Sequence, residues 1–277
     1  MAIRHVRPKR LKLLYVTGSS GFLGRHIVNG ITAQPWEIVA QTSQALDLRD
    51  RQSVIDVIRD WRPTAIIHTA YRKNDRRSIV DATRHVAEAA AIVGSRLVHI
   101  STDALFAGRP MAYTERDSPT PVHQYGRGKT EAEQIVAGLC PSAVIVRTSL
   151  LLDGLLLGGS DMSIHEIAVR DAIHGRSPIA FFTDEVRSPA LVVDLAATLT
   201  KLAGRPEITG VLHLAGPDAL SRADLALMIA RRHGWDATRL QFATLAESGL
   251  SRPGHVVLDS SLARSHGLTV RGPASWP

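Results

Sequence analysis

Three glycines, with two residues between each pair, separate a short apolar run from an amphipathic segment near the start of the chain. The apolar run, residues 12–16, predicts a buried strand, and residues 22–32 carry apolar side chains at helical spacing. A strand, a glycine turn and a helix in direct succession are typical of the first unit of a doubly wound sheet. This unit constrains the fold strongly, because a strand followed directly by a helix favours a parallel neighbour reached by a crossover.

Strands and helices keep alternating after this unit. Strands are predicted at residues 37–41, 64–68, 96–100, 143–146 and 211–214, and helices at 51–61, 75–93, 124–137, 162–174 and 188–202. Ser221 and Asp224 have the spacing of a capping box that opens a further helix, and residues 150–159 are predicted to form a loop. The alternation predicts an α/β fold, a Rossmann-like doubly wound parallel sheet.

The glycine turn has the chemistry of a dinucleotide site. A pyrophosphate is bound by free N–H groups at a helix N-terminus, and the backbone must approach it closely. Gly18 permits the tight turn, Gly21 the close approach and Gly24 the packing of the helix on the strand, with Phe22 and Leu23 between them. The turn is therefore predicted to bind a dinucleotide; a glycine-rich turn without a ligand is the alternative.

Two further strand ends are expected to meet this turn, because the carboxyl ends of parallel strands share one edge of the sheet. His68, Thr69 and Ala70 end one strand and are predicted to line the cofactor crevice. Thr102 and Asp103 end another. Residues 13–150 are then the dinucleotide-binding domain, after a basic extension at 1–12. Residues 151–277 complete the sheet and form a small C-terminal substrate lobe.

The end of the second strand indicates which dinucleotide is preferred. NAD sites usually place a carboxylate there, whereas this chain has Gln41 followed by two hydroxyl residues. A 2′-phosphate would meet no repulsion, and Arg25 is close enough in sequence to reach it. NADP(H) is therefore the predicted cofactor, with NAD(H) as the second choice. Asp47, beside Leu48, is a candidate acceptor for the adenine amine, or simply a loop acid.

Tyr125 and Lys129 form a Tyr-x-x-x-Lys pair, and residues four apart share a helix face. The pKa of a free tyrosine is about 10, and a nearby ammonium group would lower it. We expect Tyr125 to donate a proton to a carbonyl, with Lys129 lowering its pKa and holding the nicotinamide ribose. The hydroxyl of Thr102 would bond the same substrate oxygen. A surface helix contact is the alternative for an isolated pair of this kind.

Charge and cysteine content exclude several other classes. The formal net charge is +7, but five lysines and arginines lie within residues 4–12, without an acid between them. Without these five, the 33 basic residues fall to 28 against 26 acidic ones, so no nucleic-acid partner is predicted. No apolar run or leader predicts a membrane partner. The single cysteine, Cys140, favours a buried structural role and a cytoplasmic location. The dispersed histidines predict no metal site, and His213 is expected to be a strand residue.

The chain resembles the extended short-chain dehydrogenases/reductases, and within them the dTDP-4-dehydrorhamnose reductase family. The similar segments cover nearly the whole chain. They are residues 17–24, 62–63 with 68–70, 101–108, 125–131, 146–149, 187–190 and 252–261. The resemblance implies reduction of a 4-keto sugar nucleotide by NAD(P)H, with Thr102, Tyr125 and Lys129 as the catalytic set. It also implies substrate contacts from Asp103, Arg187 and Arg252, with Arg252 near the diphosphate, and a homodimer as in the superfamily.

Three positions depart from the family pattern. Ala104 stands where a tyrosine is usual, Leu150 where a tryptophan packs on the sugar, and Ile79 where an asparagine completes the proton relay. These departures bear on the rhamnose-type substrate and on the full proton relay, and not on the cofactor. Two alternatives therefore stay open: an epimerase or dehydratase that recycles its cofactor, and a non-catalytic regulatory subunit that binds a dinucleotide.

Overall fold

The computed structural model describes residues 12–30, 36–152 and 162–276. A parallel sheet forms its centre, made of β1 (Lys12–Thr17), β2 (Trp36–Gln41), β3 (Ala65–His68), β4 (Arg96–Thr102), β5 (Val144–Thr148) and β10 (Gly210–His213). The order across the sheet is β10-β5-β4-β3-β1-β2. The chain thus runs outward from β1 to β2, returns to β3 and continues the other way. This doubly wound order, as predicted, places the topological switch point between β1 and β3, where such sheets bind ligands.

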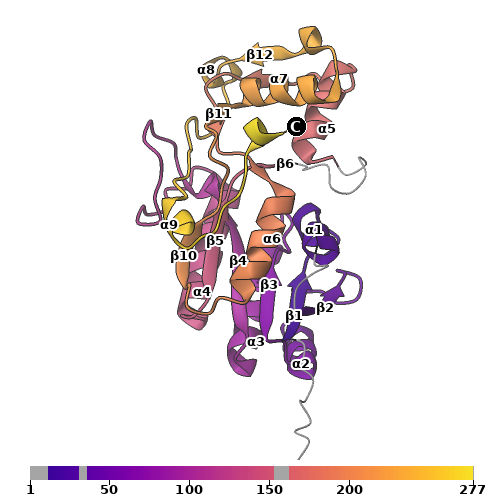
Figure 1. Ribbon diagram of the computed structural model, residues 1–277, viewed down its shortest axis with the longest axis vertical. Helices are drawn as coiled ribbons and strands as arrows, with labels where there is room; N and C mark the ends of the chain where they lie inside the picture. The colour runs from indigo at the N-terminus through magenta and orange to yellow at the C-terminus, as the bar shows by residue number, and fades with distance from the viewer. Residues whose placement is uncertain (1–11, 31–35, 153–161, 277) are drawn as a thin grey trace, which may run out of the picture.

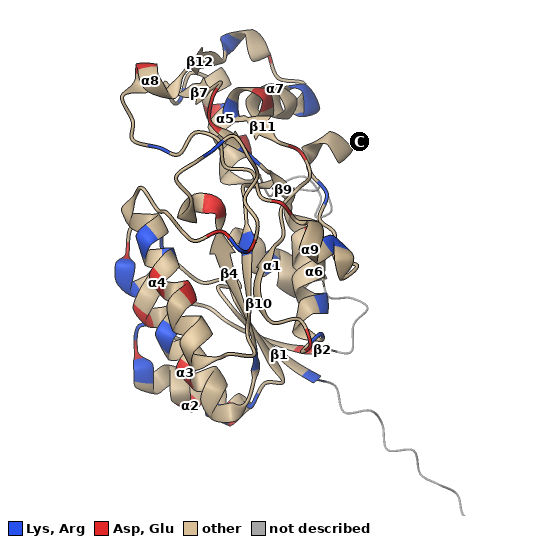
Figure 2. Cartoon of the chain, turned by 90° about the vertical axis from the view of Figure 1, so that its left-hand side faces the viewer, with Lys and Arg blue, Asp and Glu red and all other residues tan. Residues whose placement is uncertain are grey.

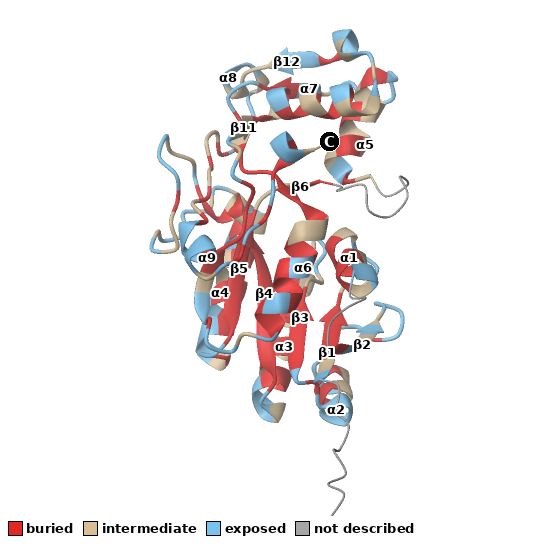
Figure 3. Ribbon diagram, in the orientation of Figure 1, coloured by how far each residue is buried: buried red, intermediate tan, exposed pale blue. Residues whose placement is uncertain are grey.

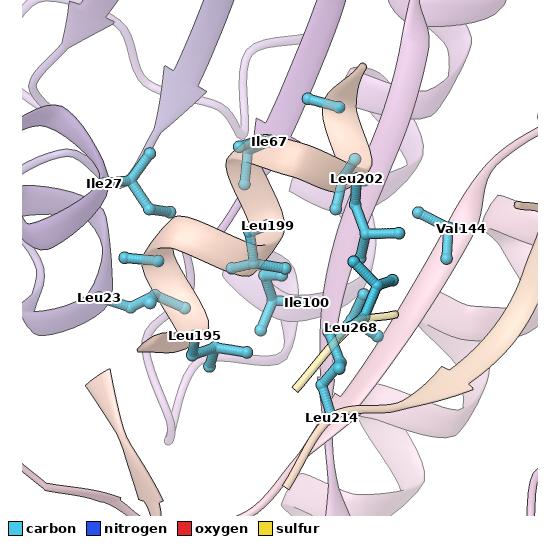
Figure 4. Packing of buried hydrophobic residues seen from close by; sticks show 14 of the residues in the cluster. Leu23, Ile27, Ile67, Ile100, Val144, Leu195, Leu199, Leu202, Leu214 and Leu268 are labelled. Atoms are coloured by element: carbon cyan, nitrogen blue, oxygen red, sulfur yellow. The ribbon is translucent and has the colours of Figure 1, made fainter. Parts of the chain in front are cut away.

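Helices cover both faces of the sheet (Figure 1). One face carries α1 (Phe22–Gly30) and α6 (Val192–Ala203), and the other carries α2 (Arg51–Trp61), α3 (Ala82–Val93) and α4 (Gln124–Leu139). Neighbouring strand residues point to opposite faces, so Leu14 and Val16 pack with α1 and α6 whereas Tyr15 packs with α2 and α3. Figure 4 shows the first of these cores, and Figure 3 shows the strands buried between the two layers.

A smaller lobe lies beyond the carboxyl ends of the strands (Figure 1). It contains α5 (Ile164–Ile173), α7 (Arg222–His233), α8 (Leu245–Ser248), β7 (Ala180–Phe182), β8 (Val186–Arg187), β11 (Leu220–Ser221) and β12 (Gln241–Ala243). The short pair β6 (Leu151–Leu152) and β9 (Ala190–Leu191) joins it to the sheet domain, and α9 (Ser261–Ser265) packs beside β10. The lobe has its own apolar core, formed mainly by α5 and α7. It therefore packs as a unit over the edge of the sheet.

Most predicted elements are confirmed, with shifted ends. The helix predicted from residue 75 begins as a turn of π-helix at Arg77–Asp81. The helix predicted from residue 188 begins at Val192, because Ala190–Leu191 pairs with Leu151–Leu152 as a strand. Leu151–Leu152 is thus a strand, where the sequence predicted part of a loop at 150–159. Residues 1–11, 31–35 and 153–161 lie outside the described part of the chain.

Three single-residue expectations can also be compared with the structure. Ser221 caps α7 by accepting from the Asp224 N–H, but the Asp224 carboxylate bonds the Ser221 hydroxyl, so the cap differs from a reciprocal capping box. Cys140 is buried, with its Sγ donating to the carbonyl of Ala87. His213 ends β10 as predicted. In the described residues, no helix has the length and apolarity that crossing a bilayer requires.

Candidate active site

A cavity of about 860 Å³ lies between the carboxyl edge of the sheet and the lobe. The glycine turn, the ends of β2, β3 and β4, and the start of α4 line it from the sheet domain. The N-terminal residues of α5 and α7 and the segment around Arg252 line it from the lobe. Most of the predicted site residues therefore line this one cavity. On the outer helices, basic and acidic residues are interspersed (Figure 2).

The glycine turn has the close backbone packing that its spacing predicts. Gly18 has a φ of 70°, and a Cβ there would lie 2.8 Å from the backbone N of Ala70. A Cβ at Gly24 would overlap the carbonyl of Gly18, which accepts from the Gly21 N–H at 2.9 Å. The first N–H groups of α1 have no acceptor within the helix, and the residues that carry them line the cavity. A pyrophosphate fits this cradle.

The end of β3 only partly follows the prediction. Thr69 and Ala70 line the cavity, and the Thr69 hydroxyl donates to the Thr17 carbonyl at 2.7 Å. His68 does not line it, which corrects its assignment as a cofactor residue. Its ring is buried beneath the sheet edge, with Nδ1 2.7 Å from Thr17 Oγ1 and Nε2 3.1 Å from Thr83 Oγ1. Burial lowers the pKa of His68 to about 3, so the ring is neutral.

Basic side chains gather near the end of β2. Arg25 lines the cavity there, together with Asp47 and Leu48. Arg49, which the sequence did not single out, also lines it and holds the Asp47 carboxylate, with Nη2 2.8 Å and Nε 3.0 Å from its oxygens. These bonds lower the pKa of Asp47 to about 2. Arg49 thus orients the Asp47 carboxylate, whose oxygens keep further acceptor sites, so its role as an adenine acceptor stays a prediction.

Tyr125 and Lys129 both line the cavity from the first turns of α4, which begins where the His123 side chain accepts from the Gly126 N–H. The Lys129 ammonium is buried and donates to the Ile100 carbonyl at 2.6 Å. Burial lowers the pKa of Lys129 to about 8. The two residues therefore do share a face, with the amine directed at the end of β4.

The predicted lowering of the Tyr125 pKa is corrected. Burial raises it well above the ordinary value and Tyr71 raises it further, whereas a hydrogen bond with Thr102 lowers it. Tyr71, which the sequence did not single out, places its ring centroid 5.6 Å from that of Tyr125 and 5.3 Å from Lys129 Nζ. With its pKa raised, Tyr125 is protonated at neutral pH in the ligand-free site.

The predicted substrate residues surround the other end of the cavity. Asp103 is buried and accepts from the Ser149 hydroxyl at 2.6 Å, and Arg187 Nε lies 3.8 Å from it. Arg187 also donates to backbone carbonyls, including that of Pro253 at 2.8 Å, and its Nη2 lies 3.4 Å from Glu185 Oε1. Arg252 is partly exposed, with Nη2 3.4 Å from Glu185. Asp103, Arg187 and Arg252 were predicted, whereas Ser149 and Glu185 were not. Arg187 mainly orders the segment that carries Arg252.

The three departures from the family pattern have separate surroundings. Ala104 and Leu150 line the cavity, so both leave it with an apolar surface in place of a larger ring. Ile79 is buried against Ile135 and Tyr125 under α4. A buried aliphatic side chain here packs the base of the catalytic helix and offers no hydrogen bond.

Comparison with known proteins agrees with this geometry. The family model described as RmlD substrate binding domain matches residues 12–275. A dTDP-4-dehydrorhamnose reductase of Mycobacterium tuberculosis is 31% identical over 253 residues, 86% of this chain and 81% of that protein. Methionine adenosyltransferase 2 subunit beta of Pongo abelii is 28% identical over 284 residues, 93% and 83% of the two chains. The structure of a Bacillus anthracis dTDP-4-dehydrorhamnose reductase in complex with NADP has a TM-score of 0.84 at 27% identity and covers 95% of each chain.

The fold and the site are those of an NAD(P)-dependent oxidoreductase of the short-chain dehydrogenase/reductase type. Within that class, the chain belongs to the dTDP-4-dehydrorhamnose reductase family, the family of the RmlD substrate binding domain.

Proposed function

We propose that this protein reduces the keto group of a 4-keto sugar nucleotide, with NADPH as the preferred donor and NADH as a second one. The observation that carries the proposal is that Thr102, Tyr125 and Lys129 line the same cavity as the glycine turn. The reductase relatives support the substrate class, and the NADP complex of the Bacillus anthracis reductase supports the cofactor.

The chain offers distinct groups for each part of the cofactor. The N–H groups of Phe22 and Leu23 would hold the pyrophosphate at the start of α1. Arg25 and Arg49 would meet a 2′-phosphate, and Lys129 the nicotinamide ribose. Bound NADPH supplies the hydride.

The proton comes from the Tyr125 hydroxyl. A tyrosine hydroxyl is protonated at neutral pH, and Thr102, which makes a hydrogen bond with Tyr125, would bond the same carbonyl oxygen. As the carbonyl gains electron density, Tyr125 Oη releases its proton to that oxygen. Arg252 and Asp103 are the proposed substrate contacts, while Arg187 positions residues 253 and 254.

The quaternary structure and location belong to the same proposal. The family resemblance supports a homodimer, which light scattering at several concentrations tests. A free buried cysteine is compatible with a reducing cytoplasm, which fluorescent tagging tests.

The deciding experiment follows NADPH absorbance with dTDP-4-dehydrorhamnose, the 4-keto sugar nucleotide named for the reductase relatives, as substrate. Tyr125→Phe should lower kcat by about 100-fold or more. Tyr113→Phe is the matched control, because its hydroxyl bonds the Gly108 N–H away from the cavity. NADPH binding without reduction of any keto-sugar nucleotide would favour a regulatory subunit such as the methionine adenosyltransferase relative. Conversion of a sugar nucleotide without net NADPH loss would favour an epimerase.

A further inference from the structure

Arg222 and Glu185 are neighbours at the lobe side of the cavity. β11 pairs antiparallel with β8, with Leu220 opposite Arg187 and Ser221 opposite Val186. One residue further, the Arg222 N–H donates to the Glu185 carbonyl at 2.9 Å. Residues opposite each other in such a ladder have adjacent side chains, and both side chains line the cavity.

Each of these side chains has one buried polar atom without a partner. Among the described residues, neither Arg222 Nη1 nor Glu185 Oε2 makes a hydrogen bond. The other ends are fixed: Arg222 Nη2 lies 3.2 Å from His165 Nδ1, and Glu185 Oε1 lies 3.4 Å from both Arg187 Nη2 and Arg252 Nη2. Buried polar groups in folded proteins nearly always find a partner. An unpaired donor and an unpaired acceptor at one cavity wall therefore indicate a ligand.

The pair also indicates the chemistry of that ligand. A hydroxyl group accepts from a guanidinium and donates to a carboxylate, so sugar hydroxyls satisfy both atoms. A phosphate oxygen would satisfy Arg222 but would face the Glu185 carboxylate. His165 adds no charge, because burial lowers its pKa to about 3. Burial lowers the pKa of Arg222 only to about 10, so its guanidinium is charged at neutral pH.

We propose that Arg222 and Glu185 bind hydroxyl groups of the substrate's sugar ring and thereby select the sugar that the enzyme accepts. This proposal rests on the sugar-nucleotide reductase function proposed above. It assigns the diphosphate to other groups, so it separates the recognition of the sugar from the recognition of the nucleotide.

Calorimetric titration of the full chain, saturated with NADP⁺, tests this with two probes: dTDP-glucose, which carries the hydroxyls, and dTDP, which lacks the sugar. Arg222→Gln and Glu185→Gln should each weaken dTDP-glucose binding by about 10- to 100-fold, the usual loss for a hydrogen bond to a charged group. In Arg222→Gln, which leaves the Glu185–Arg252 contact in place, binding of dTDP should change by less than about threefold. Arg222→Lys, which restores a donor, should recover part of the loss.

The matched control is Arg231→Gln, which removes the same charge from an exposed position on α7 away from the cavity. Unchanged NADPH affinity in every variant would show that the fold is intact. Equal weakening of dTDP and dTDP-glucose would assign the pair to the diphosphate and overturn the proposal, as would no weakening of either. If the unaltered protein bound neither probe, the sugar-nucleotide function would itself fail. Selective loss of dTDP-glucose binding without any NADPH-dependent reduction would instead leave the hydroxyl site standing and the reductase activity rejected.

Discussion

The sheet side of the cavity and its lobe side differ in what gives each its shape. On the sheet side, backbone packing dominates: Gly18 and Gly24 pack so closely that a Cβ on either would meet neighbouring backbone atoms. On the lobe side, charged side chains from two-residue strands and helix starts dominate, with Arg187, Glu185 and Arg222 held in one network. A binding site built from backbone atoms suits a cofactor that many enzymes share. A site built from side chains can change its substrate specificity through single substitutions. We therefore expect the sheet side to provide cofactor binding and the lobe side to determine which substrate binds.

Gly24→Ala should disrupt the close backbone packing on the sheet side of the cavity. Its Cβ would meet the Gly18 carbonyl and lie 2.9 Å from Ser19 Cα, so α1 would have to move away from β1. Such overpacking costs about 1–3 kcal/mol, and we expect NADPH binding to weaken by about 10- to 100-fold in fluorescence titrations. Gly138→Ala is the control, because no atom lies within 4 Å of its Cβ position and alanine favours the helix. Equal NADPH affinity in both variants would contradict the prediction, because it would show that α1 can shift away from β1 without loss of cofactor binding.

The sequence predicted the sheet side better than the lobe side, for physical reasons. Strand–helix alternation and glycine spacing are local patterns, and they placed the turn, Thr69 and the Tyr125–Lys129 pair at one cavity. The pairing of β8 with β11 joins distant two-residue strands, too short for any periodicity, so Arg222 and Glu185 could not be found. His68 was misplaced because the last residue of β3 still points beneath α3, where Thr83 bonds it. The Lys129 amine donates to the backbone carbonyl of Ile100, and no sequence pattern identifies that carbonyl as its partner.

Lys129 is buried on the sheet side of the site, and its burial predicts a pH effect on stability. Its pKa is lowered from 10.5 to about 8 in the folded state. Between these values the unfolded chain binds more protons than the folded one, so the free energy of unfolding of the ligand-free protein should rise with pH, by about 3 kcal/mol at most. Below about pH 8 both states are protonated and this contribution no longer changes.

Urea denaturation at several pH values in this window measures the effect. Lys129→Met should remove the rise, whereas Lys201→Met, at an exposed position on α6, should keep it. An identical pH dependence in Lys129→Met and the unaltered protein would mean that the amine is not desolvated as its position indicates.

Arg49 tests the difference between the two sides with the smallest expected effect. It contributes a side chain on the sheet side, where backbone atoms otherwise shape the site. Its guanidinium lines the cavity near the end of β2, but Asp47 and Asp75 already neutralise part of its charge. We therefore expect Arg49→Gln to weaken NADPH binding by only about 5- to 10-fold and to leave NADH binding unchanged, with Arg25→Gln having an effect of the same sign.

Paired titrations with NADPH and NADH measure this, with Arg59→Gln on the exposed end of α2 as the control. Equal losses for both dinucleotides would place Arg49 against a part that they share. Tight NADH binding beside weak NADPH binding in the unaltered protein would contradict the assigned preference. A selective loss for NADPH would show that the 2′-phosphate is recognised by side chains added to the cradle, so that even on the sheet side specificity comes from side chains and general affinity from the backbone.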